Sequence, residues 1–392
     1  MAILVQEMEH LHTKSRIQTV DMLRGLVMII MALDHVRDFW SASPFRPEDV
    51  TQTSTALFFT RFVTHFCAPV FVFLSGVSIY FTEQRAKDKR SVAVQLLKRG
   101  MWLVLIQVTV ISFMMQFAYN LIILEVIWVI GWSMIIMAVL IWLPRKVMAA
   151  VAIVLIAGHN LWPPFAPITT GNFLLAMLHN SPGVLVVSGL PVIIIAYTII
   201  PWVGVMAAGY LMAIVFSFPM EKQIGYWRTT GIFLIALFIG LRFLNVYGDS
   251  TPWAAQERGE WYTFLSFLNV TKYPPSLLFL SLTLGVAMIA LTFMSKPGPI
   301  GTVLNTFGRV PFFYYLIHIP LIVLGAYLWG YFQFGTIVSF AFQSPDQWPK
   351  GYSPSIVRTY VVWTIYVIIL YFPCRWYGAY KGRNSQAWLS YV

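Results

Sequence analysis

Long apolar segments separated by short polar stretches recur along the whole chain. A helix that crosses the roughly 30 Å hydrocarbon layer of a membrane needs about 20 apolar residues. Apolar windows of this kind predict about ten spans. We expect these spans at residues 20–40, 57–81, 101–120, 122–143, 147–162, 196–217, 229–247, 275–294, 310–330 and 356–376. The pattern therefore predicts an all-α, polytopic membrane bundle.

One stretch fits this pattern poorly. Residues 184–217 are apolar over more than one span, but Gly189, Pro191 and Pro201 interrupt them and β-branched residues are frequent. Such a segment can be extended or re-entrant inside a membrane only where protein covers its backbone. We therefore expect part of it to be a buried extended or re-entrant segment.

The composition supports the membrane interpretation. Hydrophobic residues make up 58% of the chain, charged residues 10%, and the mean hydropathy is +0.72. About a quarter of the residues of a soluble domain are charged, so an ordinary soluble enzyme is excluded. The net charge of +11 does not indicate nucleic-acid binding, because the basic residues lie in short loops between apolar segments.

The basic loops predict the orientation of the chain. With ten spans they all fall on one side, and excess Lys and Arg marks the cytoplasmic side. We expect a cytoplasmic N-terminal segment over 1–19, a single transmembrane domain over 20–376, and a cytoplasmic tail over 377–392. Residues 1–19 lack the apolar core of a signal peptide.

The cysteines indicate neither a disulfide scaffold nor a metal site. Cys67 and Cys374 are the only two cysteines and lie far apart in the sequence. The chain has no CxxC motif and no Cys/His cluster at metal-ligand spacing. No bound metal is expected.

The first span carries a stripe of charged residues. Eleven helical steps separate Arg24 from His35, which brings them to within roughly 20° of one face and about 16 Å apart along the axis. Asp21 and Asp38 flank this face, and Asp34 lies slightly further round. For any one of these residues, a purely structural role is an alternative, with Arg24 paired to Asp21 and His35 paired to Asp38. Because charges in a bilayer must face protein, water or a partner, the whole stripe favours a functional cavity.

The second span adds Arg61 and His65, four residues apart and hence on one face. Its antiparallel direction predicts that His65 reaches a depth similar to that of His35. A histidine held by a carboxylate is a suitable base for deprotonating an amine or hydroxyl. For His65, a hydrogen bond to a backbone carbonyl in the core is an equally good interpretation.

Other polar residues lie near the later spans. Lys272, followed by Tyr273, stands at the outer end of span eight, where it can neutralise an anion or simply reach the interface beside an aromatic ring. His318 can line a cavity or bond to another helix, and Arg242 has the same two interpretations.

Several segments resemble a known family. VDMLRGLVMIIMALDH is similar to the signature of membrane acyltransferases in which ten residues separate an Arg from a His. HFCAPVFVFLSG, IPWVGVMAAGYLM, LRFLNVYGDSTPW, VTKYPPSLLFL and FGRVPFFYYLIHIPLI resemble the bacterial branch of the heparan-α-glucosaminide N-acetyltransferase catalytic-domain family. These segments extend from residue 20 to about residue 320.

The resemblance implies a multi-pass protein of the bacterial inner membrane, with a homodimer as its assembly. It also implies acyl transfer from cytoplasmic acyl-CoA, usually acetyl-CoA, to an amine or hydroxyl of an extracytoplasmic sugar or glycan. Arg24 matches the signature Arg, a candidate for contacting CoA, and His35 matches the signature His. Lysosomal members resemble the chain here but have Asn at the place of Asp34 and their catalytic His in the following loop. Residues 41–56 contain no His, so His35 and His65 both remain candidates.

These observations give an acyltransferase hypothesis. His35, oriented by Asp34 or Asp38, deprotonates the acceptor, or it forms an acyl-His intermediate. Three further residues would stabilise the thioester oxyanion or hold acceptor anions: Arg61, Lys272 and Tyr273. The main rival is a transporter or flippase that uses the same charged cavity, and a structural or partner-binding membrane protein is the third hypothesis.

Overall fold

The computed structural model describes residues 18–162, 168–179, 182–295, 298–384 and 386–390 of the 392-residue chain. Its first nine α-helices are α2 (Gln18–Trp40), α3 (Thr55–Thr64), α4 (Cys67–Arg85), α5 (Lys89–Ile106), α6 (Ser112–Met114), α7 (Val126–Leu140), α8 (Arg145–Ala157), α9 (Phe173–His179) and α10 (Ile199–Met212). The next six are α11 (Met220–Leu244), α12 (Glu260–Leu268), α13 (Leu277–Phe293), α14 (Pro299–Gly308), α15 (Pro311–Phe334) and α16 (Ile356–Arg383). The strands are β1 (Leu121–Leu124), β2 (Gly183–Leu185) and β3 (Val192–Ile195).

The helices confirm a polytopic membrane protein. Within the described part of the chain, six helical segments are long and apolar enough to cross a membrane: Thr55–Arg85, Lys89–Met114, Ile199–Ser217, Met220–Leu244, Pro311–Phe334 and Ile356–Arg383. The helices α7 and α13 are apolar but shorter. The helix α2 has 23 residues, and its charged stripe explains why its composition alone does not mark it as a span. Each predicted span overlaps a helix. The count of ten, the sidedness of the termini and the domain boundaries remain predictions.

The second predicted span is divided into α3 and α4, with a turn at His65 and Phe66. Pro69 explains the break, because proline has no N–H to donate to the carbonyl of His65 four residues earlier. The first backbone bond of α4 instead runs from Val70 N to Phe66 O, at 3.3 Å. The turn places the C-terminal end of α3 next to the C-terminal half of α2.

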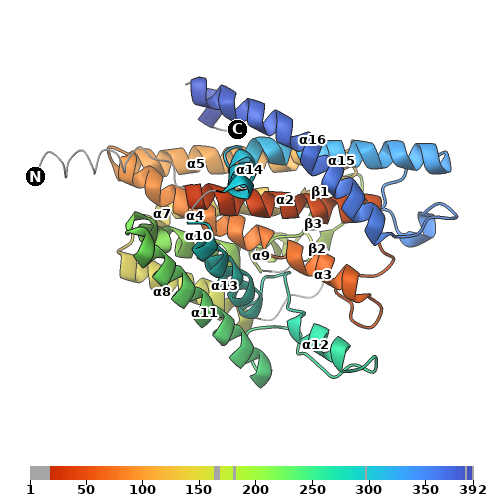
Figure 1. Ribbon diagram of the computed structural model, residues 1–392, viewed down its shortest axis with the longest axis horizontal. Helices are drawn as coiled ribbons and strands as arrows, with labels where there is room; N and C mark the ends of the chain where they lie inside the picture. The colour runs from red at the N-terminus through yellow and green to blue at the C-terminus, as the bar shows by residue number, and fades with distance from the viewer. Residues whose placement is uncertain (1–17, 163–167, 180–181, 296–297, 385, 391–392) are drawn as a thin grey trace, which may run out of the picture.

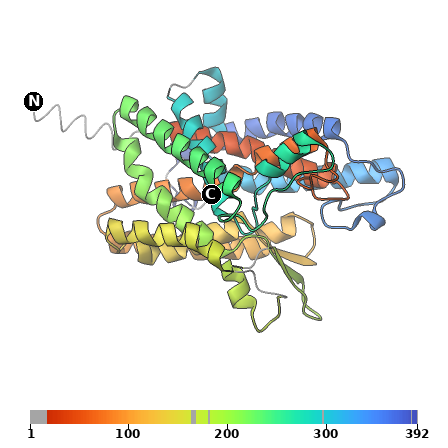
Figure 2. The ribbon, with the colours of Figure 1, turned by 90° about the horizontal axis from the view of Figure 1, so that it is seen from below.

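A small sheet makes the all-α prediction incomplete. Its strand order is β1-β3-β2, with β1 and β3 parallel and β2 antiparallel to β3. Leu121 pairs with Val192, and Gly183 pairs with Ile195. The strands β2 and β3 confirm the expectation of extended structure near residue 184, which β-branched residues and Pro191 favour over a helix. Figure 2 shows the strands below the helices, on the side away from α16.

Glycines allow several helices to pack in backbone contact. A Cβ on Gly76 of α4 would lie 1.9 Å from Met206 O, and one on Gly209 of α10 would lie 2.0 Å from Phe73 O. Small residues at such crossings let membrane helices approach closely. Three further helix pairs are joined in the same reciprocal way: α2 with α14 through Gly25 and Gly308, α5 with α7 through Gly100 and Gly131, and α11 with α13 through Gly231 and Gly285.

The helices α2, α5 and α15 run along the long axis of the molecule, whereas α8, α11 and α13 cross it obliquely (Figure 1). The helices α3 and α12 and the loop between α15 and α16 lie at the right-hand end of that view. The N-terminal end of α2 points to the left-hand end. The axis of α2 therefore connects the two ends of the molecule, and its charged stripe follows this axis.

Candidate active site

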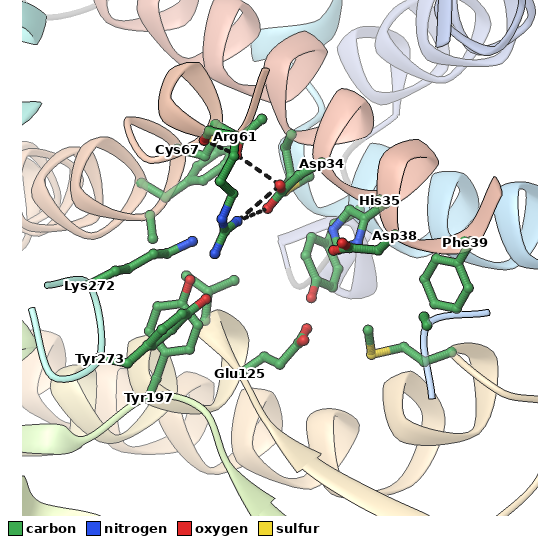
Figure 3. Close-up of a pocket in the computed structure, with 18 of the residues that line it drawn as sticks. Asp34, His35, Asp38, Phe39, Arg61, Cys67, Glu125, Tyr197, Lys272 and Tyr273 are labelled. Carbon is green, nitrogen blue, oxygen red and sulfur yellow. Dashed lines mark hydrogen bonds and ion pairs between the residues drawn. The ribbon is translucent and has the colours of Figure 1, made fainter. Parts of the chain in front are cut away.

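A polar cavity of about 290 Å³ lies beside the C-terminal half of α2. Elements far apart in sequence supply its polar lining, as Figure 3 shows: α2, α3, the start of α4, the segments that follow β1 and β3, the loop before α13, and α15. The polar and cysteine side chains of this central cavity are Asp34, His35, Asp38, Arg61, Thr64, Cys67, Glu125, Tyr197, Lys272, Tyr273 and Tyr315. The structure thus brings together six predicted site residues, Asp34, His35, Asp38, Arg61, Lys272 and Tyr273.

Asp34 is held by three neighbours. Arg61 Nη1 donates to both of its carboxylate oxygens, at 3.0 and 2.8 Å, and Thr64 Oγ1 donates at 2.8 Å. Arg37 Nη1 lies 2.9 Å from Asp34 Oδ1. Paired charges of this kind can be buried because each ion compensates the other. Asp34 therefore joins α2 to α3, and its oxygens are engaged by these partners rather than available to orient His35.

His35 packs against a second imidazole. Its ring centre lies 5.1 Å from that of His318, with the rings at 61°. His318 is fully buried, and its Nδ1 lies 3.0 Å from Tyr314 O and 2.8 Å from Tyr315 O. These carbonyls favour the tautomer with the proton on Nδ1. His318 therefore packs against the ring of His35 and is hydrogen-bonded to its own helix. It is not among the side chains that line the central cavity.

Lys272 reaches the cavity wall. Its side chain is buried, and Nζ lies 5.1 Å from the ring centre of Tyr273 and 6.0 Å from that of Tyr197. Among the residues that the structure describes, no carboxylate lies within ion-pair distance of it. Lys272 is therefore a buried cation that faces aromatic rings, which a cation–π interaction stabilises.

A second cavity of about 430 Å³, the outer cavity, shares Lys272 and Tyr273 with the central one. Its other lining residues are Arg46, Glu48, Asp49, His65, Pro182, Ser250, Thr251, Asn269, Val270 and Thr271. His65 is 5% exposed, and its Nε2 has no hydrogen-bond partner in the described part of the chain. The structure therefore places His35 and His65 in neighbouring cavities.

The loop 41–54 contributes two carboxylates, Glu48 and Asp49, and the guanidinium of Arg46 to the outer cavity. Burial would raise the pKa of Glu48, but attraction by Arg61 and Arg46 outweighs burial and lowers that pKa below its usual value. Hydrogen bonds, the strongest from Thr51, lower the pKa of Asp49. Both carboxyl groups are therefore ionised at neutral pH.

A third cavity of about 100 Å³, the inner cavity, adjoins the other side of the central one and shares Phe71, Val126 and Tyr315 with it. Arg24 and Arg99 lie in its otherwise largely apolar wall. The predicted pair of Arg24 and Asp21 is present, at 3.0 Å. Arg24 does not line the cavity of His35, as expected from their axial separation.

Sequence reasoning missed four polar residues of the central cavity, Thr64, Glu125, Tyr197 and Tyr315. Glu125 had a signal, because it is the single acid in the apolar segment LIILEVIWVIGW. The tyrosines had none, since the chain contains 19 tyrosines and aromatic residues are common in membrane helices. Arg37, which holds Asp34, follows it by three residues and was not assigned a role.

Both cysteines are free and buried. In the described ranges, no group of three or more His, Cys, Asp or Glu side chains is placed to hold a metal ion.

A helical membrane bundle with a charged internal cavity, adjoined by a cavity on either side, belongs to the class of intramembrane enzymes and transporters. Residues 16–252 match the model of the family described as heparan-alpha-glucosaminide N-acetyltransferase, catalytic. The match covers more than half of the chain, and the protein belongs to this family. Family membership implies a transmembrane acyltransferase. No curated protein matches the sequence. The family match ends before Lys272 and Tyr273.

Proposed function

We propose that the protein moves an acyl group, most simply acetyl, from cytoplasmic acyl-CoA to an amine or hydroxyl of an extracytoplasmic sugar or glycan. The observation that supports this most is the central cavity, where an imidazole, a buried lysine and a neutralised aspartate meet between two further cavities. Family membership supplies the reaction class. The donor, the acceptor and the direction of transfer are the parts we propose.

The inner cavity suits the donor. Arg24 and Arg99 provide guanidinium groups, which bind phosphate oxygens well. The side chains around them are mainly apolar and can pack against the methyl and methylene groups of the thioester arm. A donor bound at Arg24 would place its acyl end toward His35, because the two residues share one face of α2.

The outer cavity suits the acceptor. Its carboxylates, amide and hydroxyl groups can exchange hydrogen bonds with a sugar, and Tyr273 offers an aromatic face. Ionised Glu48 and Asp49 would attract a protonated amino sugar. The shared wall at Lys272 and Tyr273 is where acceptor and donor would meet.

The transfer step uses His35 as the base. The acceptor nitrogen or oxygen attacks the thioester carbonyl carbon while His35 takes its proton. Lys272 stabilises the oxyanion, since Arg61 is already paired with Asp34. The C–S bond then breaks, and the proton taken up by His35 passes to the thiolate of CoA as it leaves. The products are the acylated acceptor and free CoA.

The test compares acetyl transfer from labelled acetyl-CoA in proteoliposomes of matched histidine variants. We expect His35→Ala to lower the rate by about 100-fold or more, because a general base contributes 10² to 10⁴. His179→Gln, at a histidine that lines none of the three cavities, is the control and should retain the wild-type rate. Full transfer by His35→Ala would remove His35 from the mechanism, and a loss confined to His65→Ala would place the base in the outer cavity.

Transport is the second candidate, because three cavities that share walls would also suit a solute path. Acetyl-CoA should raise the unfolding temperature of the acyltransferase, since a ligand stabilises the state that binds it. A shift with a transported solute and none with acetyl-CoA would favour the transporter.

A further inference from the structure

Lys272 and Tyr273 lie on a short loop that separates the central cavity from the outer one. The loop spans residues 271–276 and leads into α13. Its two ends meet, because Ser276 N donates to Thr271 O at 2.9 Å. The side chain of Lys272 therefore depends on the geometry of a closed loop rather than on a helix.

One carboxylate fastens both ends of this loop. Asp249 Oδ2 accepts from Thr271 N at 2.8 Å and from Ser276 Oγ at 2.6 Å. Asp249 Oδ1 accepts from Thr271 Oγ1 at 2.8 Å and from Thr251 N at 2.8 Å. The side chain of Asp249 is 2% exposed, so these four bonds replace its contacts with water. We call this arrangement of Asp249, Thr271 and Ser276 the clasp.

Arg242 fixes the segments around the clasp. Its side chain is buried, and it donates to the carbonyl oxygens of Phe267, Thr251, Ser266 and Asn269 at 2.7 to 2.9 Å. Its Nη1 also lies 4.0 Å from Asp249 Oδ1. A buried guanidinium that bonds to four carbonyls makes the surrounding loops rigid. The clasp therefore rests on a fixed base at the C-terminal end of α11.

Ser276 connects the clasp to the helix that follows. Its Oγ donates to Asp249 and accepts from Phe279 N at 3.0 Å, as the N-cap of α13. The clasp thus sets where α13 begins and where the loop before it turns toward the cavities.

We propose that Asp249 is a positioning residue for Lys272: its carboxylate closes the loop 271–276 and holds Lys272 at the wall between the central and outer cavities. Asp249 touches neither cavity as a lining residue, so it acts through Lys272. The kinetic consequence rests on the proposed acyl transfer, whereas the placement of Lys272 does not.

The placement is tested first, without any assay of function. A small amine-reactive reagent is added to the purified protein in detergent, and modification of Lys272 is followed by mass spectrometry. We expect Lys272 to be modified several-fold faster in Asp249→Asn than in the wild type. The amide of Asn places an N–H group where Asp249 accepts hydrogen bonds, so it cannot hold both ends of the loop as the carboxylate does. Asp346→Asn, at an exposed acid of the loop before α16, is the matched control and should react as the wild type does. Equal Lys272 reactivity in Asp249→Asn and wild type would overturn the proposal.

The kinetic test is a double-mutant cycle on acyl transfer. We expect Asp249→Asn to lower kcat/KM on the order of 10- to 100-fold, as misplacement of a catalytic group does. In a Lys272→Ala background the same change should cost less than about twofold, because Asp249 then has nothing to position. An equal loss in both backgrounds would contradict a role through Lys272.

A milder variant keeps the test decisive if Asp249→Asn fails to fold. Ser276→Ala removes one bond of the clasp and should show a smaller increase in Lys272 reactivity, with the same dependence on Lys272 in the kinetic cycle. Unchanged reactivity would again overturn the proposal. If the wild type shows no acyl transfer but Lys272 reacts faster in Asp249→Asn as expected, the proposed function is refuted and the positioning role of Asp249 still holds.

Discussion

The carboxylates around the central cavity differ in their partners. Asp34 is engaged by Arg61, Thr64 and Arg37, and Asp38 Oδ1 lies 2.6 Å from Arg37 Nη2. Glu125, at the N-terminal end of α7, has no cation within ion-pair distance in the part of the chain that the structure describes. Glutamate is not a favoured N-cap residue, and this side chain makes no capping bond but extends into the cavity (Figure 3). Glu125 therefore lines the central cavity as a carboxylate that no cation of the described residues neutralises by an ion pair.

We expect Glu125→Gln to lower acyl transfer by about tenfold or more while acetyl-CoA still raises the unfolding temperature, because the change removes a proton acceptor and preserves shape. Glu257→Gln, at an exposed acid before α12, is the control. Transfer at the wild-type rate in Glu125→Gln would assign that acid a structural role only.

At the level of the elements, paired glycines set the distance between helices. The contact of α4 with α10 is the clearest case, because Gly76 and Gly209 each face a backbone carbonyl of the other helix. The hydrophobic effect contributes little to the association of helices inside a membrane, so close backbone packing matters more there. The helix α4 also carries Cys67 and Phe71, which line the central cavity. Helix spacing and cavity shape are thus coupled.

We expect Gly76→Ala to destabilise the protein by about 1 to 3 kcal/mol, because its methyl group would collide with Met206 O and separate α4 from α10. Gly225→Ala in α11 is the matched control, with no atom within 4 Å of the new Cβ. Since Ala favours helix by about 1 kcal/mol over Gly, the control should be neutral or slightly stabilising. Reversible unfolding in detergent measures both, and equal stability of the two variants would contradict the packing argument.

At the scale of the whole molecule, the two ends differ in composition. Basic residues gather in the turn between α4 and α5, whereas the segment before α12 contains acids and aromatic residues. The described lining of the inner cavity contains Arg24 and Arg99 but no carboxylate, whereas the outer cavity contains Glu48 and Asp49 together with Arg46 and Lys272. The proposed route, with the donor entering from one end and the acceptor from the other, requires these two ends to lie on opposite sides of the membrane.

Labelling by a membrane-impermeant maleimide tests the orientation. The native cysteines are buried, so the wild type should remain unlabelled. We expect Lys87→Cys to react only when the cytoplasmic side is accessible and Glu257→Cys only from the outside, as both positions are exposed. Labelling of both variants from the same side would refute the predicted topology.

The sequence by itself determined the helical membrane class, because membrane thickness sets the length of an apolar helix. It also determined the shared face of Arg24 and His35, since the helical period fixes directions around one axis. The pair of Arg24 with Asp21 and the extended structure near residue 184 followed from local spacing and β-branched residues in the same way.

Only the tertiary structure decided which side chains meet. The helical period gives no rotation of one helix relative to another, so the bonds of Arg61 to Asp34 and the separate cavities of His35 and His65 could not be read from spacing. The approach of Lys272 required the fold of a loop closed by Asp249, far earlier in the sequence. The sequence thus placed charges along single helices, and packing between helices and loops selected which of them form one site.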